Sequence, residues 1–283
     1  MEYHLKNKCL TATFNAIGAE LTTFKSDNKN YIWDIDINFW NKTSPILFPI
    51  VGRLKNDSYE YKGIKYSLPR HGFARNAVFK VIENNESRIL FSFQSNSETK
   101  KSYPFDFELQ IGYFLDEKSL KVTYKVINKN DFQMPFSIGG HPAFSLPNDF
   151  NNYSLEFEKK EILYNYSLEN ELLTNNFESI ELVNKKLPLT YSLFEKDALI
   201  FKSILSKKVT IFEKDKPYIT VHFNNFPSLG IWTKIDAPFL CIEPWFGYAD
   251  NENNNGNISQ KEGIILLEKD EEFDCQYTIE INL

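Results

Sequence analysis

Features that mark several common classes of protein are missing from this sequence. The chain has 283 residues with a net charge of -6, and no block of Lys and Arg suggests a nucleic-acid partner. Its cysteines, Cys9, Cys241 and Cys275, are far apart and form no CxxC or Cys/His cluster, so neither a zinc site nor a disulfide framework is predicted. The spacing of possible ligands indicates no metal or other cofactor.

Leader and membrane-spanning segments are also not expected. The N-terminal stretch MEYHLKNKCLTATF lacks a basic segment followed by an apolar one, which a signal peptide requires. No apolar run approaches about 18 residues, the length that would indicate a transmembrane helix. We therefore expect a soluble protein of the reducing cytoplasm, with no membrane partner.

Aromatic residues, by contrast, are abundant. They make up 16% of the chain, with 25 Phe, 15 Tyr and 4 Trp, a composition that favours strands. Segments of alternating apolar and polar residues, bounded by polar turns, recur along the chain and are typical of an antiparallel sandwich or barrel. The clearest are residues 88–96, 107–116, 119–128, 153–159, 198–204, 208–214, 218–225, 229–234, 239–245 and 275–283.

Helical periodicity is scarce, and SLENELLTN (167–175) is the best candidate for a helix. No βαβ alternation is present, which argues against parallel α/β folds. No linker divides the chain, and the Asn-rich stretch 250–257 is predicted to be a surface loop. These patterns predict a single all-β domain over residues 1–283, a large antiparallel two-sheet sandwich with few short helices.

The segment SIGGHPAFSLP (137–147) contains one of only four histidines. Gly139 and Gly140 permit backbone angles closed to other residues, so they are expected to carry the chain through a tight turn. Pro142 pushes His141 toward extended angles. The pattern predicts an imidazole held in a fixed orientation on a loop, although an ordinary turn histidine remains an alternative. His4 and His222 have no comparable context.

A second segment, FLCIEPWFGYAD (239–250), places Glu243 in an apolar and aromatic run. Strand alternation puts Phe239, Cys241 and Glu243 on one face, with Leu240 and Ile242 on the other. Burial would raise the pKa of this carboxyl toward the range of a useful general base. Trp245 could offer an aromatic face to a sugar ring. The alternative is a structural glutamate paired with an arginine.

Arginine is rare, with four residues against 28 lysines, and three of the four, Arg53, Arg70 and Arg75, cluster around His71. Where Lys supplies most of the basic charge, an Arg suggests a need for its planar, bidentate fork. Pairing with surface carboxylates is the alternative for each arginine. Asp197, which immediately precedes an apolar strand, would by itself be a turn residue at the edge of that strand.

Taken in order, these segments resemble the aldose 1-epimerase (galactose mutarotase) family, and within it the LacX-like group. The resemblance rests on PILFPIVGRL, HGFARN, GGHPAF, DALIF, LGIWTK, CIEPWFG and KEGIILLEKDEEF, which span nearly the whole chain. It implies a galactose mutarotase-like β-supersandwich with the active site in a groove of one sheet. It also implies interconversion of the α and β anomers of a hexose.

By this resemblance, Glu243 matches the general base and His141 the general acid. His71 and Arg53 match residues that orient the sugar oxygens, and Asp197 matches one that binds a sugar hydroxyl. The enzymes that act on free galactose have an Asn-Arg pair before the first of these histidines, whereas here Arg53 follows Val51 and Gly52. The sugar is therefore left open, and a phosphorylated hexose contacting Arg75 is one alternative.

The chemistry expected of this pair is acid/base ring opening. Glu243 would begin ionised and His141 protonated, and each proton transfer would contribute on the order of 10²–10⁴ in rate. Two other functions remain open on the same fold. One is a glycoside hydrolase or lyase using Glu243 and Asp197 as its two carboxylates. The other is a carbohydrate-binding protein without catalysis.

Overall fold

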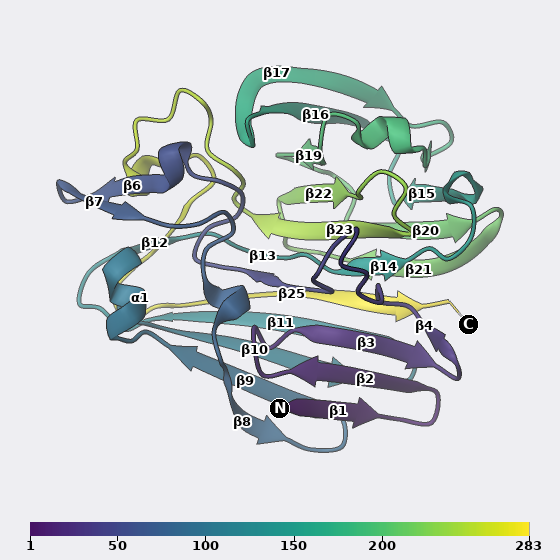
Figure 1. Ribbon diagram of the computed structural model, residues 1–283, viewed down its shortest axis with the longest axis horizontal. Helices are drawn as coiled ribbons and strands as arrows, with labels where there is room; N and C mark the ends of the chain where they lie inside the picture. The colour runs from purple at the N-terminus through teal and green to yellow at the C-terminus, as the bar shows by residue number, and fades with distance from the viewer. Residues whose placement is uncertain (283) are drawn as a thin grey trace.

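The computed structural model describes residues 1–282 and is built almost entirely from antiparallel strands (Figure 1). The widest sheet has nine strands, in the order β18-β15-β20-β21-β25-β11-β10-β9-β8. Their bounds are Lys186–Pro188, Tyr153–Phe157, Lys208–Glu213, Lys216–His222, Glu272–Ile281, Ser119–Asn128, Phe107–Leu115, Arg88–Gln94 and Lys80–Asn84. The alternating burial along β11 explains why sequence periodicity predicted this strand.

A second sheet carries the functional side chains. Its order is β19-β22-β23-β13-β5, and β14 also pairs with β23. The strands are Leu199–Phe201, Ser228–Trp232, Phe239–Phe246, Ile138–Gly140 and Ile46–Leu47, with β14 at Ala143–Ser145. In β23 the predicted alternation is confirmed: Leu240 and Ile242 join the main core, whereas Glu243 lies on the opposite face.

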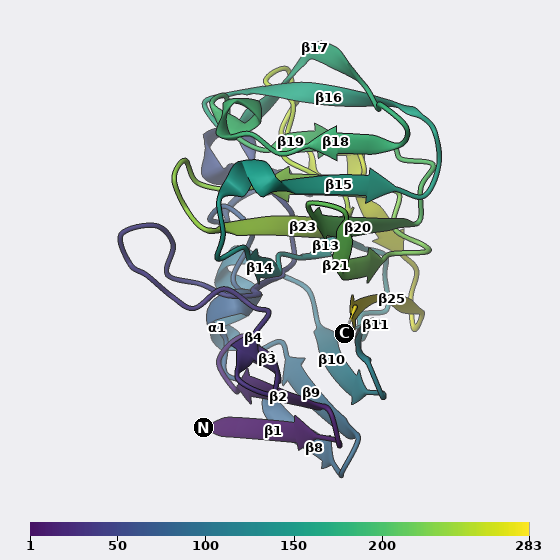
Figure 2. The same ribbon diagram turned by 90° about the vertical axis from the view of Figure 1, so that its right-hand side faces the viewer.

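Smaller sheets complete the structure. A four-stranded sheet near the N-terminus contains β1 (Glu2–Lys6), β2 (Leu10–Asn15), β3 (Leu21–Ser26) and β4 (Lys29–Asn30). Three two-stranded sheets are β6 (Ser58–Tyr61) with β7 (Ile64–Ser67), β12 (Met134–Phe136) with β24 (Ile265–Leu267), and β16 (Ile162–Glu169) with β17 (Leu172–Glu181). Figure 2 shows the β1–β4 sheet at one end of the molecule and β16–β17 at the other.

Helical structure is confined to short pieces. The α-helix α1 spans Ser97–Ser102, and 3₁₀ turns cover Lys55–Asp57, Ala74–Asn76, Phe150–Asn152, Tyr191–Phe194 and Ile258–Gln260. Asn96 caps α1, because its side chain accepts from the backbone N–H groups of Glu98 and Thr99. No helix among residues 1–282 is long and apolar enough to cross a membrane.

The helix predicted at residues 167–175 is wrong, because this segment forms the turn of the β16–β17 hairpin. Leu168 pairs with Leu173 and Glu169 with Leu172. Asn170 and Glu171 both have positive φ, at 53° and 66°, as a two-residue type I′ hairpin turn requires. The apolar spacing that suggested a helix is too short to outweigh this turn and the pairing of the two strands.

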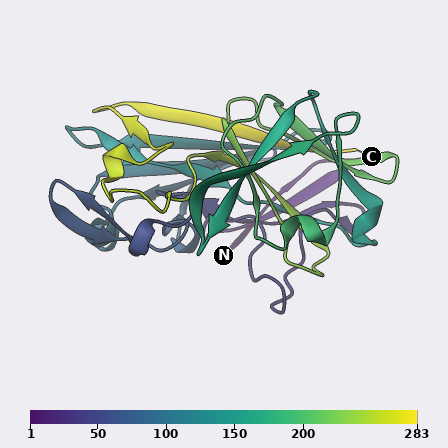
Figure 3. The same cartoon turned by 90° about the horizontal axis from the view of Figure 1, so that it is seen from above.

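The main apolar core fills the space between the nine-stranded and six-stranded sheets and extends to the β1–β4 sheet. It joins residues such as Phe14, Phe91, Ile242 and Ile279, each fully buried. The molecule is elongated when seen along the edges of the sheets (Figure 3). The core covers only the inner face of the six-stranded sheet. The outer face is lined by loops and by the β16–β17 hairpin, which together form the candidate site.

Candidate active site

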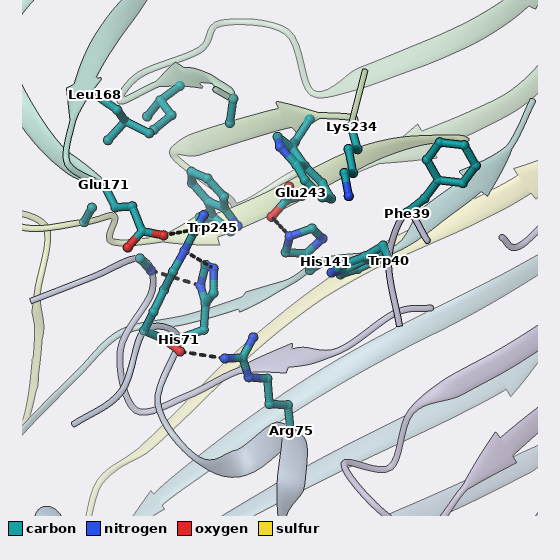
Figure 4. Close-up of a pocket in the computed structure, with 16 residues that line it drawn as sticks. Phe39, Trp40, His71, Arg75, His141, Leu168, Glu171, Lys234, Glu243 and Trp245 are labelled. Carbon is teal, nitrogen blue, oxygen red and sulfur yellow. Dashed lines mark hydrogen bonds and ion pairs between the residues drawn. The ribbon is translucent and has the colours of Figure 1, made fainter. Parts of the chain in front are cut away.

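A pocket of about 420 Å³ opens on the outer face of the six-stranded sheet (Figure 4). This volume lies within the range of pockets that hold small molecules. Its lining combines aromatic rings, imidazoles, cations and carboxylates from segments far apart in the sequence. The lining residues are Phe39, Trp40, Gly52, Arg70, His71, Arg75, His141, Leu168, Glu171, Ala198, Ile200, Trp232, Lys234, Glu243, Trp245 and Ala249.

The sequence-predicted residues Glu243 and His141 meet on the pocket floor. Nε2 of His141 lies 3.3 Å from Oε2 of Glu243, and the two residues are 8% and 1% exposed. Glu243 comes from β23, and His141 follows β13, the neighbouring strand. The backbone N–H of His141 donates to the carbonyl of Pro45, which fixes the loop that carries the imidazole.

Gly139 and Gly140 are needed for close packing rather than for a turn. Both lie in strand β13, and neither is among the glycines with positive φ, so the expectation of a tight turn is wrong. A Cβ on Gly139 would lie 2.5 Å from the indole of Trp245, and one on Gly140 would lie 2.8 Å from the hydroxyl of Tyr124. A Cβ on Gly230, on the other neighbouring strand, would also meet Trp245, at 2.4 Å. Trp245 therefore lies flat against the sheet because two of its neighbours have no side chain.

His71 enters the pocket with its tautomer fixed by the backbone. Its own N–H donates to the carbonyl of Gly52, and the N–H of Gly52 donates to Nδ1 of His71 at 3.1 Å. Burial, followed by the charge of Arg70, lowers the pKa of His71 well below its usual value, so the ring is neutral. A neutral imidazole has one acceptor nitrogen, and the Gly52 bond uses it. Nε2 therefore carries the proton.

Arg70 adds a second donor beside His71. Its Nε lies 3.2 Å from Nε2 of His71. A neutral imidazole cannot accept from both Gly52 and Arg70, so with the Gly52 bond in place Nε2–H of His71 and the guanidinium of Arg70 are two neighbouring donors. Both can donate to a ligand oxygen. The sequence indicated Arg70 only as one of three clustered arginines, because the position of its guanidinium beside the His71 ring depends on the folded loop.

The remaining predicted residues divide into two groups. Arg75 and Trp245 line the pocket, and Nη2 of Arg75 donates to the carbonyl of Arg70. Arg53 and Asp197 do not line it. Arg53 forms a bidentate pair with Asp57 at 2.8 and 2.7 Å, and Asp197 lies at the rim, where its carboxylate accepts from the N–H of Ala198.

Two aromatic side chains of the pocket, Trp40 and Trp232, were not predicted from the sequence. Trp40 stacks on the ring of His141, with centroids 4.8 Å apart and an interplanar angle of 29°. Trp232 meets the same imidazole edge-on at 5.8 Å. Trp40 belongs to the loop after β4, a projecting segment in Figure 2. Nothing in its local sequence indicates that it packs against His141, about a hundred residues away in the chain.

Several buried polar atoms on the pocket floor have no hydrogen-bond partner among residues 1–282. They are Nδ1 of His141, Oε2 of Glu243 and Nε1 of Trp245. Buried polar atoms are nearly always paired, because leaving one unpaired costs about 1–3 kcal/mol. Unpaired donors and acceptors gathered in one pocket are typical of a site that a polar ligand completes.

Burial is the largest influence on the pKa values of Glu243 and His141 on the pocket floor. Loss of solvent raises the pKa of Glu243 well above its usual value, an effect that the charge of Arg70 partly offsets and Asp197 reinforces. Loss of solvent, and then Arg70, lowers the pKa of His141 to about 3. Both shifts favour a neutral carboxylic acid beside a neutral imidazole. The ionised Glu243 and protonated His141 from which the expected chemistry begins are thus the form that burial disfavours, and that starting state stays a prediction.

The neutral and charged forms of this pair nevertheless hold the same number of protons. Moving one proton from Glu243 to His141 converts the first form into the second without exchange with solvent. The pair can therefore take a proton at one atom and deliver one at a nearby atom. That is the requirement for reactions in which two adjacent oxygens exchange protonation states.

A pH profile would test this single-proton pair. The pair gains a second proton, and loses its base, only when the pH approaches the pKa of His141 at about 3. We therefore expect kcat/KM to stay constant from pH 7 down to about pH 4, after subtraction of the uncatalysed rate. An acidic limb near 6.5, the ordinary histidine value, would contradict this expectation. Circular dichroism at each pH would confirm that the fold persists.

One group of potential metal donors occurs in the described residues. Side-chain atoms of His141, Cys241 and Glu243 lie within 4.8 Å of one another. Metals bind the thiolate form of cysteine. Burial raises the pKa of both the Cys241 thiol and the Glu243 carboxyl, so a metal would have to displace a proton from each.

Comparison with known proteins identifies the family. Residues 1–280 match the family described as aldose 1-epimerase. The chain belongs to the aldose 1-epimerase family. It is 36% identical over 285 residues to the LacX protein (plasmid) of Lactococcus lactis subsp. lactis, with 95% of this chain and 93% of that protein covered. It is thus an isomerase with a mutarotase-type function, in a family that acts on sugars.

Solved structures of this epimerase family have the same fold. A galactose mutarotase related enzyme from Lactobacillus acidophilus superimposes with a TM-score of 0.96 at 32% identity, covering 100% of this chain and 98% of that one. A galactose mutarotase-like protein from Lactobacillus casei gives 0.93 at 29% identity, with both chains fully covered. The predicted all-β mutarotase-like fold is therefore confirmed.

Proposed function

We propose that this epimerase interconverts the α and β anomers of a hexose or hexose phosphate by acid/base ring opening and closure. The observation that carries the proposal is the buried pair Glu243 and His141, 3.3 Å apart on the floor of a pocket of sugar size. The two oxygens that exchange protons in this reaction are bonded to the same carbon. An acid and a base that serve them must therefore lie close together.

In this proposal the sugar is bound by groups that already point into the pocket. Nε2–H of His71 and the guanidinium of Arg70 bind a sugar oxygen, Arg75 lies behind them, and Nε1–H of Trp245 gains an acceptor. The apolar face of the sugar ring packs on an indole. Arg53 and Asp197 act indirectly, Arg53 by holding the carboxylate of Glu171 and Asp197 by its charge near Glu243.

Ring opening begins from the charged form of the pair, after one proton has passed from Glu243 to His141. Glu243 then removes the proton of the C1 hydroxyl, and the electron pair of that O–H bond forms the C1=O bond. The C1–O5 bond breaks, and O5 takes the proton of His141. The pair is now neutral, the form that burial favours. Rotation about C1–C2 followed by the reverse steps gives the other anomer.

The test is the rate at which single anomers of glucose, galactose and their 6-phosphates equilibrate, followed by polarimetry or NMR. We expect the protein to accelerate at least one of these reactions above the rate in buffer. Binding of a hexose without any acceleration would instead support a carbohydrate-binding protein. Release of new reducing ends from an oligosaccharide would support a hydrolase, although Asp197 does not share the pocket with Glu243.

A further inference from the structure

The carboxylate of Glu171 bridges two arginines at the mouth of the pocket, with one oxygen on each. Oε2 of Glu171 accepts from Nη1 of Arg53 at 2.7 Å, and Oε1 accepts from Nη1 of Arg70. Glu171 and Arg70 both line the pocket, and the close-up shows Glu171 near His71 and Trp245 (Figure 4). Arg53 is saturated on its other side by Asp57. The negative charge of Glu171 thus lies where an anion entering the pocket would be drawn.

The hairpin that carries Glu171 is held in place rather than hanging free. The N–H of Leu173 donates to the carbonyl of Asp250 at 2.8 Å, and the N–H of Glu252 donates to the carbonyl of Leu173. On the other strand, the side chain of Asn165 accepts from the N–H of Ile200 at 2.8 Å. Leu168, three residues before Glu171, also lines the pocket. These bonds hold the turn over the sugar site.

A phosphate group would compete with Glu171 for the same donors. Guanidinium groups bind carboxylate and phosphate through the same planar fork. A phosphorylated sugar must therefore displace Glu171, or meet its negative charge at close range. The other cations of the pocket are engaged by backbone carbonyls, Arg75 by that of Arg70 and Lys234 by that of Asn38.

We propose that Glu171 is a specificity residue that reserves this pocket for unphosphorylated sugars by acting as an internal anion on Arg53 and Arg70. The inference rests on the proposed anomerisation and narrows its substrate class. A neutral sugar leaves the ion pairs of Glu171 with Arg53 and Arg70 intact, and it accepts hydrogen bonds from the remaining N–H groups of Arg70. An anionic sugar loses affinity because Glu171 already neutralises both arginines and repels a second negative charge.

The test compares wild type with Glu171→Gln, which removes the charge and keeps the size. The measured quantity is kcat/KM for a hexose 6-phosphate divided by kcat/KM for the same free hexose. We expect wild type to favour the free hexose and Glu171→Gln to raise the ratio at least about tenfold, which corresponds to about 1.4 kcal/mol. Glu171→Asn is a second variant, because Asn tolerates the positive φ of this turn.

Glu169→Gln is the matched control. Glu169 is exposed, lies in the same hairpin and forms no ion pair among the residues that the structure describes. Its substitution removes the same charge and should leave the ratio unchanged. A ratio that rises equally in Glu169→Gln would show that only the net charge matters, and would overturn the specific role of Glu171.

Calorimetry with inorganic phosphate separates this inference from the proposed function. We expect phosphate binding to Glu171→Gln that is at least about tenfold tighter than to wild type. If no sugar is anomerised but this gain appears, the proposed function fails and the role of Glu171 stands. If free hexose is anomerised but neither the ratio nor phosphate binding changes, the role of Glu171 fails alone. A wild-type preference for the 6-phosphate would also overturn it.

Discussion

Replacing Glu243 with glutamine is expected to reduce the catalysed rate of anomerisation by about 10²–10⁴-fold, because it removes the proposed general base. An amide has nearly the shape of the neutral carboxylic acid that burial favours at this position. The variant should therefore fold and keep its unfolding transition. The measurement is polarimetry of a freshly dissolved anomer, with the rate in buffer subtracted.

The chain offers a matched control for this experiment. His222 and Glu280 form a second imidazole–carboxylate contact, 2.9 Å long, on the nine-stranded sheet and away from the pocket. Glu280→Gln makes the same chemical change at a partly exposed pair and should leave the rate of anomerisation unaltered. Near-normal rates in a folded Glu243→Gln protein would refute the assignment of the base.

Replacing His141 with asparagine is expected to cause a loss of the same order, about 10²–10⁴-fold, because an amide cannot deliver a proton to the ring oxygen. His222→Asn serves as its control. Since Glu243 and His141 share one proton, removing either disables the pair. The double variant should therefore be little worse than either single variant, as is found for catalytic groups that act as a unit.

Additive losses would contradict this shared-proton arrangement. If the double variant lost the product of the two single factors, each residue would act independently. The comparison is valid only for folded proteins, so near-ultraviolet circular dichroism should accompany each rate. His141→Asn also removes the ring on which Trp40 stacks, and a shift in the unfolding transition would report that packing separately.

Sequence patterns predicted the strands whose side chains alternate regularly between apolar and polar along the chain. The strict alternation in β11 and the division of β23 into two faces follow from side chains that point alternately to either side of a strand. Glu243 was recognisable because a carboxylate within an apolar run needs a special reason. The resemblance to aldose 1-epimerases then linked it with His141, far away in the sequence.

Other parts of the site depend on contacts that no local pattern contains. Glu171 was assigned to a helix, because a short run of leucines and polar residues fits more than one periodicity. The contacts of Glu171 with Arg53 and Arg70 exist only in the folded protein, where the hairpin lies beside both arginines. The need for Gly139 likewise comes from the Trp245 indole on the neighbouring strand, not from its own backbone angles.

The face-to-face contact between Trp40 and His141 gives the protein a built-in optical reporter. Indole emission is quenched when a protonated imidazole lies against the ring. Light emitted by Trp40 therefore senses the same nitrogen atoms that carry out the chemistry. Arrival of a ligand and movement of the proton can be followed in real time without an added dye, as the part of the emission that is lost in Trp40→Phe.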